Sequence, residues 1–203
     1  MPFHDFSTHS IPPSFFWFNP PANSFFDQGL HLITKPATDF WQTTHYGFQR
    51  DDGHCLLTRL TEDFSITTKT RFQPNSQYDQ CGLMLRIDSK NWIKCSTEYE
   101  DANVSRLGSV VTNYGFSDWS TQDIASTVQA VRYRLSKRQQ DVLIEYSLDG
   151  QKWHQMRVAH LHLPAKSVDV GIYACSPVGK GFQCQFDWIE IGANQWFYET
   201  APS

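Results

Sequence analysis

Apolar and polar residues alternate along most of the chain, and this alternation predicts an all-β protein. Because successive side chains of a strand point to opposite faces, each alternating run predicts a strand with one apolar face. No run of helical periodicity reaches three turns. Turn residues separate the runs every ~10–15 positions, which indicates ~11–13 strands. The clearest alternating runs are 64–69, 80–88, 92–100, 142–146, 168–174 and 182–191.

The strands predicted over 80–88 and 92–100 have the most informative faces. The tight connection 88–91 predicts that they pair as a hairpin. A slip of one residue would bury two cations and a carboxylate between the sheets, at several kcal/mol per ion, so the register is well determined. One face of the pair is apolar and carries Cys81, Leu83, Leu85, Ile87, Ile93 and Cys95. The opposite face is mixed and carries Met84, Arg86, Trp92, Lys94 and Glu98.

Turn chemistry supports the same set of strands. Asp149-Gly150 lies between two alternating runs and predicts a hairpin, because glycine tolerates the positive φ of such turns. The surrounding run 147–153 resembles the Asp-box turns of sialidase-like β proteins, and this implies a structural role, with Trp153 packed beneath the turn. In the last strand, 182–191, strict alternation places Phe186 and Trp188 on one side together with Phe182 and Cys184.

The chain of 203 residues shows no internal repeat, no low-complexity tract and no domain boundary. Its proline-rich opening is interleaved with aromatic residues, which are rare in disordered linkers. We therefore expect residues 1–25 to pack on the domain rather than to hang free. The number of strands suits two stacked sheets. The sequence predicts one domain over residues 1–203, an all-β, two-sheet antiparallel sandwich.

Composition and charge narrow the range of functions. Charged residues make up only 19% of the chain and the net charge is −4, which gives no electrostatic basis for binding nucleic acid or an anionic membrane. The N-terminus lacks the basic start and long apolar stretch of a secretory signal. Five cysteines without regular spacing predict reduced thiols. We therefore expect a cytoplasmic protein.

Several runs, in order along nearly the whole chain, resemble the regulation of enolase protein 1 family. They are Thr38–Trp41, His45–Gly47, Gln77–Met84, Asn91–Lys94, Ser109–Asn113, Ser117–Ser120, Ser147–Trp153 and Gly171–Pro177. The resemblance implies a concanavalin A-like jelly roll. Related domains serve as lectins, as glycosidases and as modules appended to glycosidases, so the fold alone does not choose an activity.

In concanavalin A-like sandwiches the concave sheet carries the ligand, so the mixed face of the central hairpin is the candidate binding surface. An aromatic plane can stack on a sugar ring while charged side chains bond its hydroxyls. We expect one pocket lined by Arg86, Trp92, Lys94 and Glu98. The alternative is an exposed sheet face with cross-strand ion pairs.

Residues on the following strand end and on an earlier loop are candidates for the pocket rim, because binding groups concentrate on loops. They are Asn113, Trp119 and His45, with Trp41 and Tyr46 beside the latter. In the alternative, Trp119 plugs the sandwich edge and His45 is structural. His160 and His162 alone are a weak metal signal, and no cofactor-binding motif occurs. We therefore predict neither a metal nor a cofactor.

Three functions fit these residues. The first is a lectin-like domain that binds a carbohydrate or sugar derivative on its concave face, which predicts a shallow site without a strongly perturbed carboxylate. The second is a glycoside-active enzyme with Glu98 as general acid or base, which predicts a closed pocket and a shifted carboxylate pKa. The third is a regulatory or scaffold protein with a protein partner, which predicts an exposed apolar patch and no concavity.

Overall fold

The computed structural model describes residues 3–196, which form seventeen strands and one short 3-10 helix, η1 (Phe6–Thr8). The first strands are β1 (Phe3–Asp5), β2 (Phe16–Phe18), β3 (Asn23–Phe26), β4 (Leu30–Ile33), β5 (Phe40–Gln42), β6 (Gln49–Asp51), β7 (His54–Leu60), β8 (Phe64–Gln73) and β9 (Gln80–Asp88). The remaining strands are β10 (Asn91–Tyr99), β11 (Val104–Asn113), β12 (Phe116–Ala125), β13 (Ala130–Arg138), β14 (Asp141–Ser147), β15 (His154–His160), β16 (Val168–Cys175) and β17 (Gln183–Gly192). The all-β prediction is confirmed.

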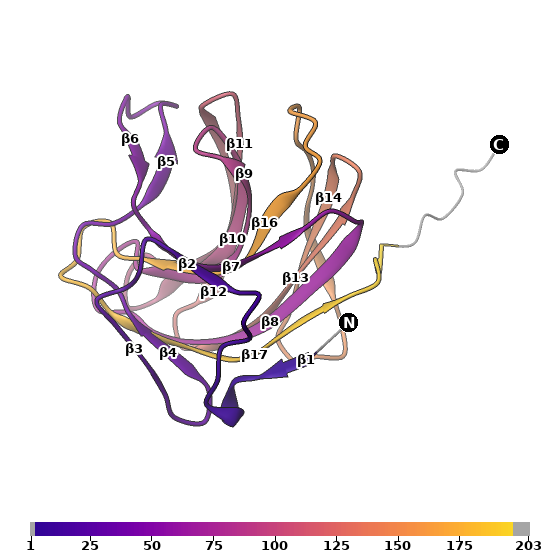
Figure 1. Cartoon of the computed structure of the whole chain (residues 1–203). Coiled ribbons are helices and arrows are strands. Elements are labelled where there is room, and N and C mark those ends of the chain that lie inside the picture. Colours follow the sequence, from indigo (N-terminus) through magenta and orange to yellow (C-terminus); the bar gives the residue numbers. More distant parts are fainter. Residues whose placement is uncertain (1–2, 197–203) are drawn as a thin grey trace.

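Two large antiparallel sheets form the predicted sandwich (Figure 1). The first has the order β15-β14-β13-β8-β17-β4-β3, with β1 added on β17, and the second has the order β12-β11-β10-β9-β16-β7-β2. A small third sheet, β5-β6, rises beside β9 and β11 in Figure 1. Apolar side chains from both large sheets meet in one core, which includes Ile66 and Leu135 from one and Leu83, Leu85 and Ile93 from the other.

The predicted central hairpin is present in the predicted register. Trp92 lies opposite Arg86, Lys94 opposite Met84, and Glu98 opposite Gln80. All of these side chains therefore leave the seven-stranded sheet on its outer face, away from the core between the sheets.

The N-terminal segment joins both large sheets. β1 pairs with β17, β2 pairs with β7, and β3 pairs with β4. The proline-rich opening thus provides edge strands on either side of the sandwich, and β2 lies beside β7 at the end of the seven-stranded sheet. The outermost positions of the predicted domain, 1–2 and 197–203, lie outside the described residues.

Two predictions about tryptophans need correction. A β-bulge between Phe186 and Ile189 shifts the register of β17, so Ile189 and not Trp188 takes the next core position. Trp153 is only half-buried and lies with the Arg134 guanidinium 4.2 Å from its ring centre. The turn before it is built as predicted, because Asp149 Oδ1 accepts hydrogen bonds from the backbone N–H groups of Gln151 and Lys152.

All five cysteines are buried and unpaired, in agreement with the prediction of reduced thiols. Over residues 3–196, no helix has the length and apolar character needed to cross a membrane.

Candidate functional site

The small β5-β6 sheet, together with the loop 43–48 that joins its strands, forms a flap over the outer face of the seven-stranded sheet. The loop turns tightly, because Thr43 and His45 both adopt positive φ and Gly47 follows at φ 74°. The flap is fixed to the sheet by the buried Phe40 side chain and by hydrogen bonds of its backbone. The Gln42 N–H donates to Ser117 Oγ at 2.9 Å, and Lys94 Nζ donates to the Phe40 carbonyl at 2.9 Å.

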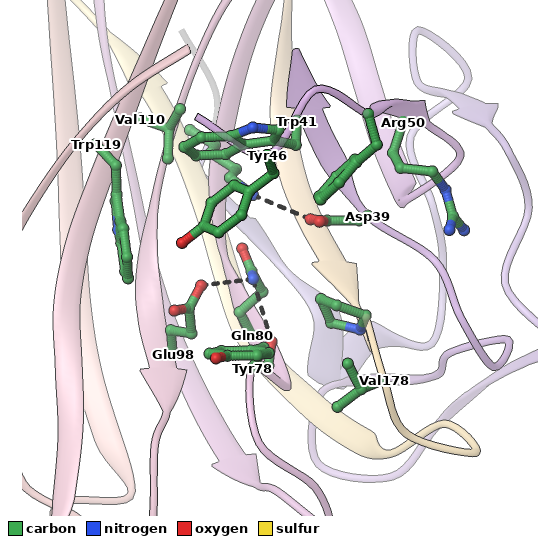
Figure 2. A pocket seen from close by; sticks show the side chains of 13 residues that line it. Asp39, Trp41, Tyr46, Arg50, Tyr78, Gln80, Glu98, Val110, Trp119 and Val178 are labelled. Atoms are coloured by element: carbon green, nitrogen blue, oxygen red, sulfur yellow. Dashed lines mark hydrogen bonds and ion pairs between the residues drawn. The ribbon is translucent and has the colours of Figure 1, made fainter. Parts of the chain in front are cut away.

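A cavity of about 530 Å³ lies between the flap and strands β9 to β12 (Figure 2). Aromatic side chains form much of its wall: Trp41, Tyr46 and Phe48 from the flap, Tyr78 from the segment before β9, and Trp119 from β12. The polar and charged lining consists of Asp39, Arg50, Gln80, Lys94 and Glu98, and the rest is Val110, Pro177 and Val178. Aromatic walls around a few polar groups are typical of small-molecule sites.

Glu98 lies on the floor of this cavity and is held by its cross-strand neighbour. Its Oε2 accepts a hydrogen bond from Gln80 Nε2 at 2.7 Å. Gln80 is fixed in turn, since its Nε2 also donates to the Tyr78 carbonyl and its Oε1 accepts from the Tyr173 hydroxyl. Within the described chain, Glu98 Oε1 takes part in no hydrogen bond, so a ligand can reach it.

Lys94 lies four residues before Glu98 on the same face of β10. It is almost fully buried, but its ammonium group has hydrogen-bond and ion-pair partners. Its Nζ lies 3.4 Å from Asp39 Oδ1, in addition to its bond with the Phe40 carbonyl. Burial alone would lower the pKa of Lys94, but the nearby carboxylates of Asp39 and Glu98 raise it above its usual range. Lys94 therefore remains a cation and anchors the flap.

The environment of Glu98 disfavours its charge. Burial raises the pKa of Glu98 to about 7, and the neighbouring Asp39 and Glu100 add to this effect while Lys94 opposes it. A carboxyl group with this pKa exchanges a proton near neutral pH, so it can either donate or accept a hydrogen bond to a ligand.

Arg86 and Trp92 do not line the cavity, so the predicted four-residue pocket is wrong in its extent. Both point to the predicted face, but they lie six residues along β10 from Glu98, which corresponds to about 20 Å. Arg86 makes a bidentate ion pair with Asp51 at 2.7–2.8 Å and lies 4.5 Å from the ring centre of Phe18. Trp92 is fully buried.

The physical reason is that other segments of the chain cover this half of the face. Phe18 of β2 and Phe40 of β5 pack over it, and Phe40 contacts Trp92 edge-on at 6.1 Å between ring centres. Arg86 and Trp92, which were predicted to contact a ligand, instead contact β2 and the flap of the same chain.

Asn113 and His45 are likewise outside the cavity lining. Asn113 Nδ2 donates to the His160 carbonyl and its Oδ1 accepts from the His162 N–H, so Asn113 ties β11 to the end of β15 and the segment after it. His45 is exposed on the flap tip, where its ring lies against Tyr46. The described residues hold no group of three or more His, Cys, Asp or Glu side chains suited to a metal ion.

Trp119, which was expected at the pocket rim, belongs to the cavity lining, and Gly108 beside it leaves space for the indole. It stands on β12 opposite Val110 and is 38% exposed. A methyl group on the neighbouring Gly108 would lie 3.1 Å from Trp119 Nε1, a tight contact that a small shift of the indole would relieve. The glycine thus allows the ring to lie close to the sheet with one side toward the cavity.

Sequence reasoning missed several residues of the site. Asp39 directly precedes β5 and Arg50 lies in β6, while Tyr78 lies just before β9 and Gln80 is its first residue. The signal available for Gln80 was strand parity, which places it across from Glu98 in the predicted hairpin. No local pattern indicated that the flap would fold over this hairpin.

Comparison with known proteins agrees with the resemblance in the sequence. The family described as "Protein of unknown function (DUF1349)" matches residues 17–194. Regulation of enolase protein 1 from Saccharomyces cerevisiae is 35% identical over 177 residues, which cover 85% of this chain and 86% of that protein. A solved structure of a functionally unknown protein from Saccharomyces cerevisiae superposes with a TM-score of 0.83 at 32% identity, covering 90% of this chain and 98% of the other.

A more distant relative is much longer. Xylan 1,3-beta-xylosidase from Vibrio sp is 25% identical over 156 residues, which cover 68% of this chain but only 29% of that enzyme. The match to this enzyme is therefore to a part of it. The extent of the family match and the identity to the yeast protein show that the chain belongs to the DUF1349 family and is a relative of regulation of enolase protein 1.

Proposed function

We propose that the protein binds a short carbohydrate in the cavity between the flap and the seven-stranded sheet. The observation that carries this proposal is the arrangement of aromatic side chains around buried polar groups. Trp119 and Tyr46 offer ring surfaces to the C–H face of a sugar, and the Glu98 carboxyl group reaches the same space for its hydroxyls. The match to part of a xylan 1,3-beta-xylosidase supports the same class of ligand.

Catalysis on a glycoside is the second candidate, and the pKa of about 7 for Glu98 favours it, because a general acid or base works best near the operating pH. Glycosidases need a second carboxylate across the scissile bond. Asp39 is the other carboxylate in the lining, and its Oδ1 already accepts from the Phe40 N–H and from Lys94. Binding without turnover therefore has the stronger support.

A regulatory role fits the name of the yeast relative and is compatible with sugar binding. In this form of the proposal, a ligand in the cavity would control contacts with a protein partner. The five buried, unpaired cysteines are consistent with a reducing compartment, so we further propose that the protein acts in the cytoplasm.

The proposal is tested by titrating the protein with neutral mono- and oligosaccharides, including xylo-oligosaccharides, and following the tryptophan indole N–H signals by NMR. We expect the signals of Trp41 and Trp119 to move on saturation. Trp119→Ala should weaken binding by about tenfold or more, because stacking on an aromatic ring is lost. Trp153→Ala serves as the control, since Trp153 lies outside the cavity lining. Absence of any shift at millimolar sugar would refute the proposal.

A further inference from the structure

The charge of Glu98 lacks a partner of its own, although several cations lie near it. Lys94 is paired with Asp39 at 3.4 Å, and Arg50 with Asp52 at 2.7 Å. Arg106, the cation on the adjacent strand β11, is shared by Glu100 at 3.0 Å and Asp123 at 2.8 Å. Within the described residues Glu98 forms no ion pair, so the groups around the cavity leave at least one negative charge uncompensated when Glu98 is ionised.

The carboxyl group is also turned toward the cavity and almost removed from water. The Glu98 residue is only 9% exposed, and of its two oxygens Oε2 is bound to Gln80 while Oε1 remains available. A buried carboxylate is strongly stabilised by a cation that arrives with hydrogen-bond donors. The site therefore favours a ligand with a positively charged group beside Glu98.

Aromatic rings enclose the space in which such a cation would lie. Figure 2 shows Tyr46, Tyr78 and Trp119 on different sides of the Glu98 carboxyl group. The faces of aromatic rings attract cations, most strongly when water is excluded. An aromatic enclosure around one carboxylate fits an ammonium group better than it fits a neutral hydroxyl or an anion.

We propose that the natural ligand is an amino sugar, whose protonated amine lies between Glu98 and the aromatic rings while the sugar ring stacks on Trp119. This inference rests on the proposed function and adds the class of sugar. It excludes sugar acids and sugar phosphates as preferred ligands, because the cations near the cavity are already neutralised by Asp39, Asp52, Glu100 and Asp123.

The test compares matched pairs that differ in one amine. Glucosamine, galactosamine and mannosamine are titrated against glucose, galactose and mannose by NMR at pH 7.0, with N-acetylglucosamine as the neutral form of the amine and choline as a cation without a sugar. We expect at least one amino sugar to bind about tenfold or more tightly than its parent sugar, because a charge-assisted contact replaces a neutral one. N-acetylation should remove this preference.

Two variants test whether Glu98 causes the preference for the amino sugar: Glu98→Gln and the control Asp123→Asn. Glu98→Gln keeps the acceptor for Gln80 but lacks the charge, so the ratio of affinities within each pair should fall to about one. Asp123→Asn removes the same charge from a side chain that is 66% exposed and outside the cavity lining, and the ratio should persist.

The outcomes separate this inference from the proposed function. If the neutral sugars bind as tightly as their amines, or if Glu98→Gln retains the preference, the amino-sugar inference is wrong and sugar binding stands. If choline binds and every sugar fails, or if nothing binds, the carbohydrate site itself is refuted.

Discussion

The outer face of the seven-stranded sheet has two halves that look alike in the sequence and differ in the structure. The covered half carries Arg86 and Trp92, and the open half carries Glu98 and Trp119. Each half thus combines an ionisable side chain with an indole: Arg86 of β9 with Trp92 of β10, and Glu98 of β10 with Trp119 of β12. In the covered half the protein's own Phe18, Phe40 and Asp51 fill the space that a ligand occupies in our proposal for the open half.

This comparison shows that the composition of a sheet face does not define a site. Arg86 has a bidentate carboxylate partner and an aromatic ring above it, which are the contacts expected of a bound ligand. What distinguishes the halves is whether a segment from elsewhere in the chain provides those contacts. The predictions below test each half separately, beginning with the largest expected effect.

Trp92→Ala should destabilise the protein by about 3–5 kcal/mol, because it leaves a large hole beneath Phe40 in the covered half. Chemical denaturation measures this loss directly. Ligand affinity of the folded fraction should change little, since Trp92 does not line the cavity. A variant with wild-type stability but without ligand binding would reverse the roles assigned to the two halves.

Arg86→Ala should cost about 2–4 kcal/mol of folding free energy, because it leaves the partly buried Asp51 carboxylate without its cation. The matched control is Arg59→Ala. Arg59 makes the same bidentate contact, with Asp169, but its side chain is 66% exposed, so its loss should cost about 1 kcal/mol or less. Equal costs for the two variants would show that Arg86 is not part of a buried cluster.

Glu98→Gln should stabilise the protein on the order of 2 kcal/mol at pH 8 and change little at pH 4. The folded-state pKa of Glu98, about 7, lies above its ordinary value of 4.5, so between these values the folded state holds a proton that the unfolded state has lost. Wild-type stability therefore falls, relative to the variant, as pH rises from about 4.5 to 7, and the difference is constant above 7. Urea denaturation of both proteins across this range measures it. A constant difference from pH 4 to 8 would contradict the burial of Glu98.

Trp119→Ala should have the smallest effect on stability, about 1 kcal/mol or less, because its indole is 38% exposed on the edge strand β12. Thermal unfolding gives this value, and the sugar titration described above gives the effect on binding. Together, the Trp92→Ala and Trp119→Ala variants separate the effect of this sheet face on stability from its effect on ligand binding. A large loss of stability in Trp119→Ala would indicate that the indole is a structural plug of the sandwich edge.

The fold was predictable from the sequence, and so was the choice of which side chains of the central hairpin point outward, because both depend on local patterns. Strict alternation and the cost of burying ions fixed which side chains of β9 and β10 point outward. The same reasoning gave the wrong face for Trp188, because β17 contains a bulge. The one extra residue of the bulge reverses which face the following side chains occupy, and the sequence of apolar and polar residues does not reveal it. The extent of the site was not predictable, because β2 and the flap reach the hairpin from distant positions in the chain, and strand periodicity carries no information about such packing.

The flap has one more consequence, which concerns how proteins of this architecture can diversify. Its fastening to the sheet uses the carbonyl of Phe40 and the N–H of Gln42, groups that every residue at these positions except proline at the second provides. The side chains of Tyr46 and Phe48 take no part in these hydrogen bonds, so the bonds do not constrain which residues stand at positions 46 and 48. Substitutions there can alter the wall of the cavity, and with it the choice of ligand, while the loop stays where it is.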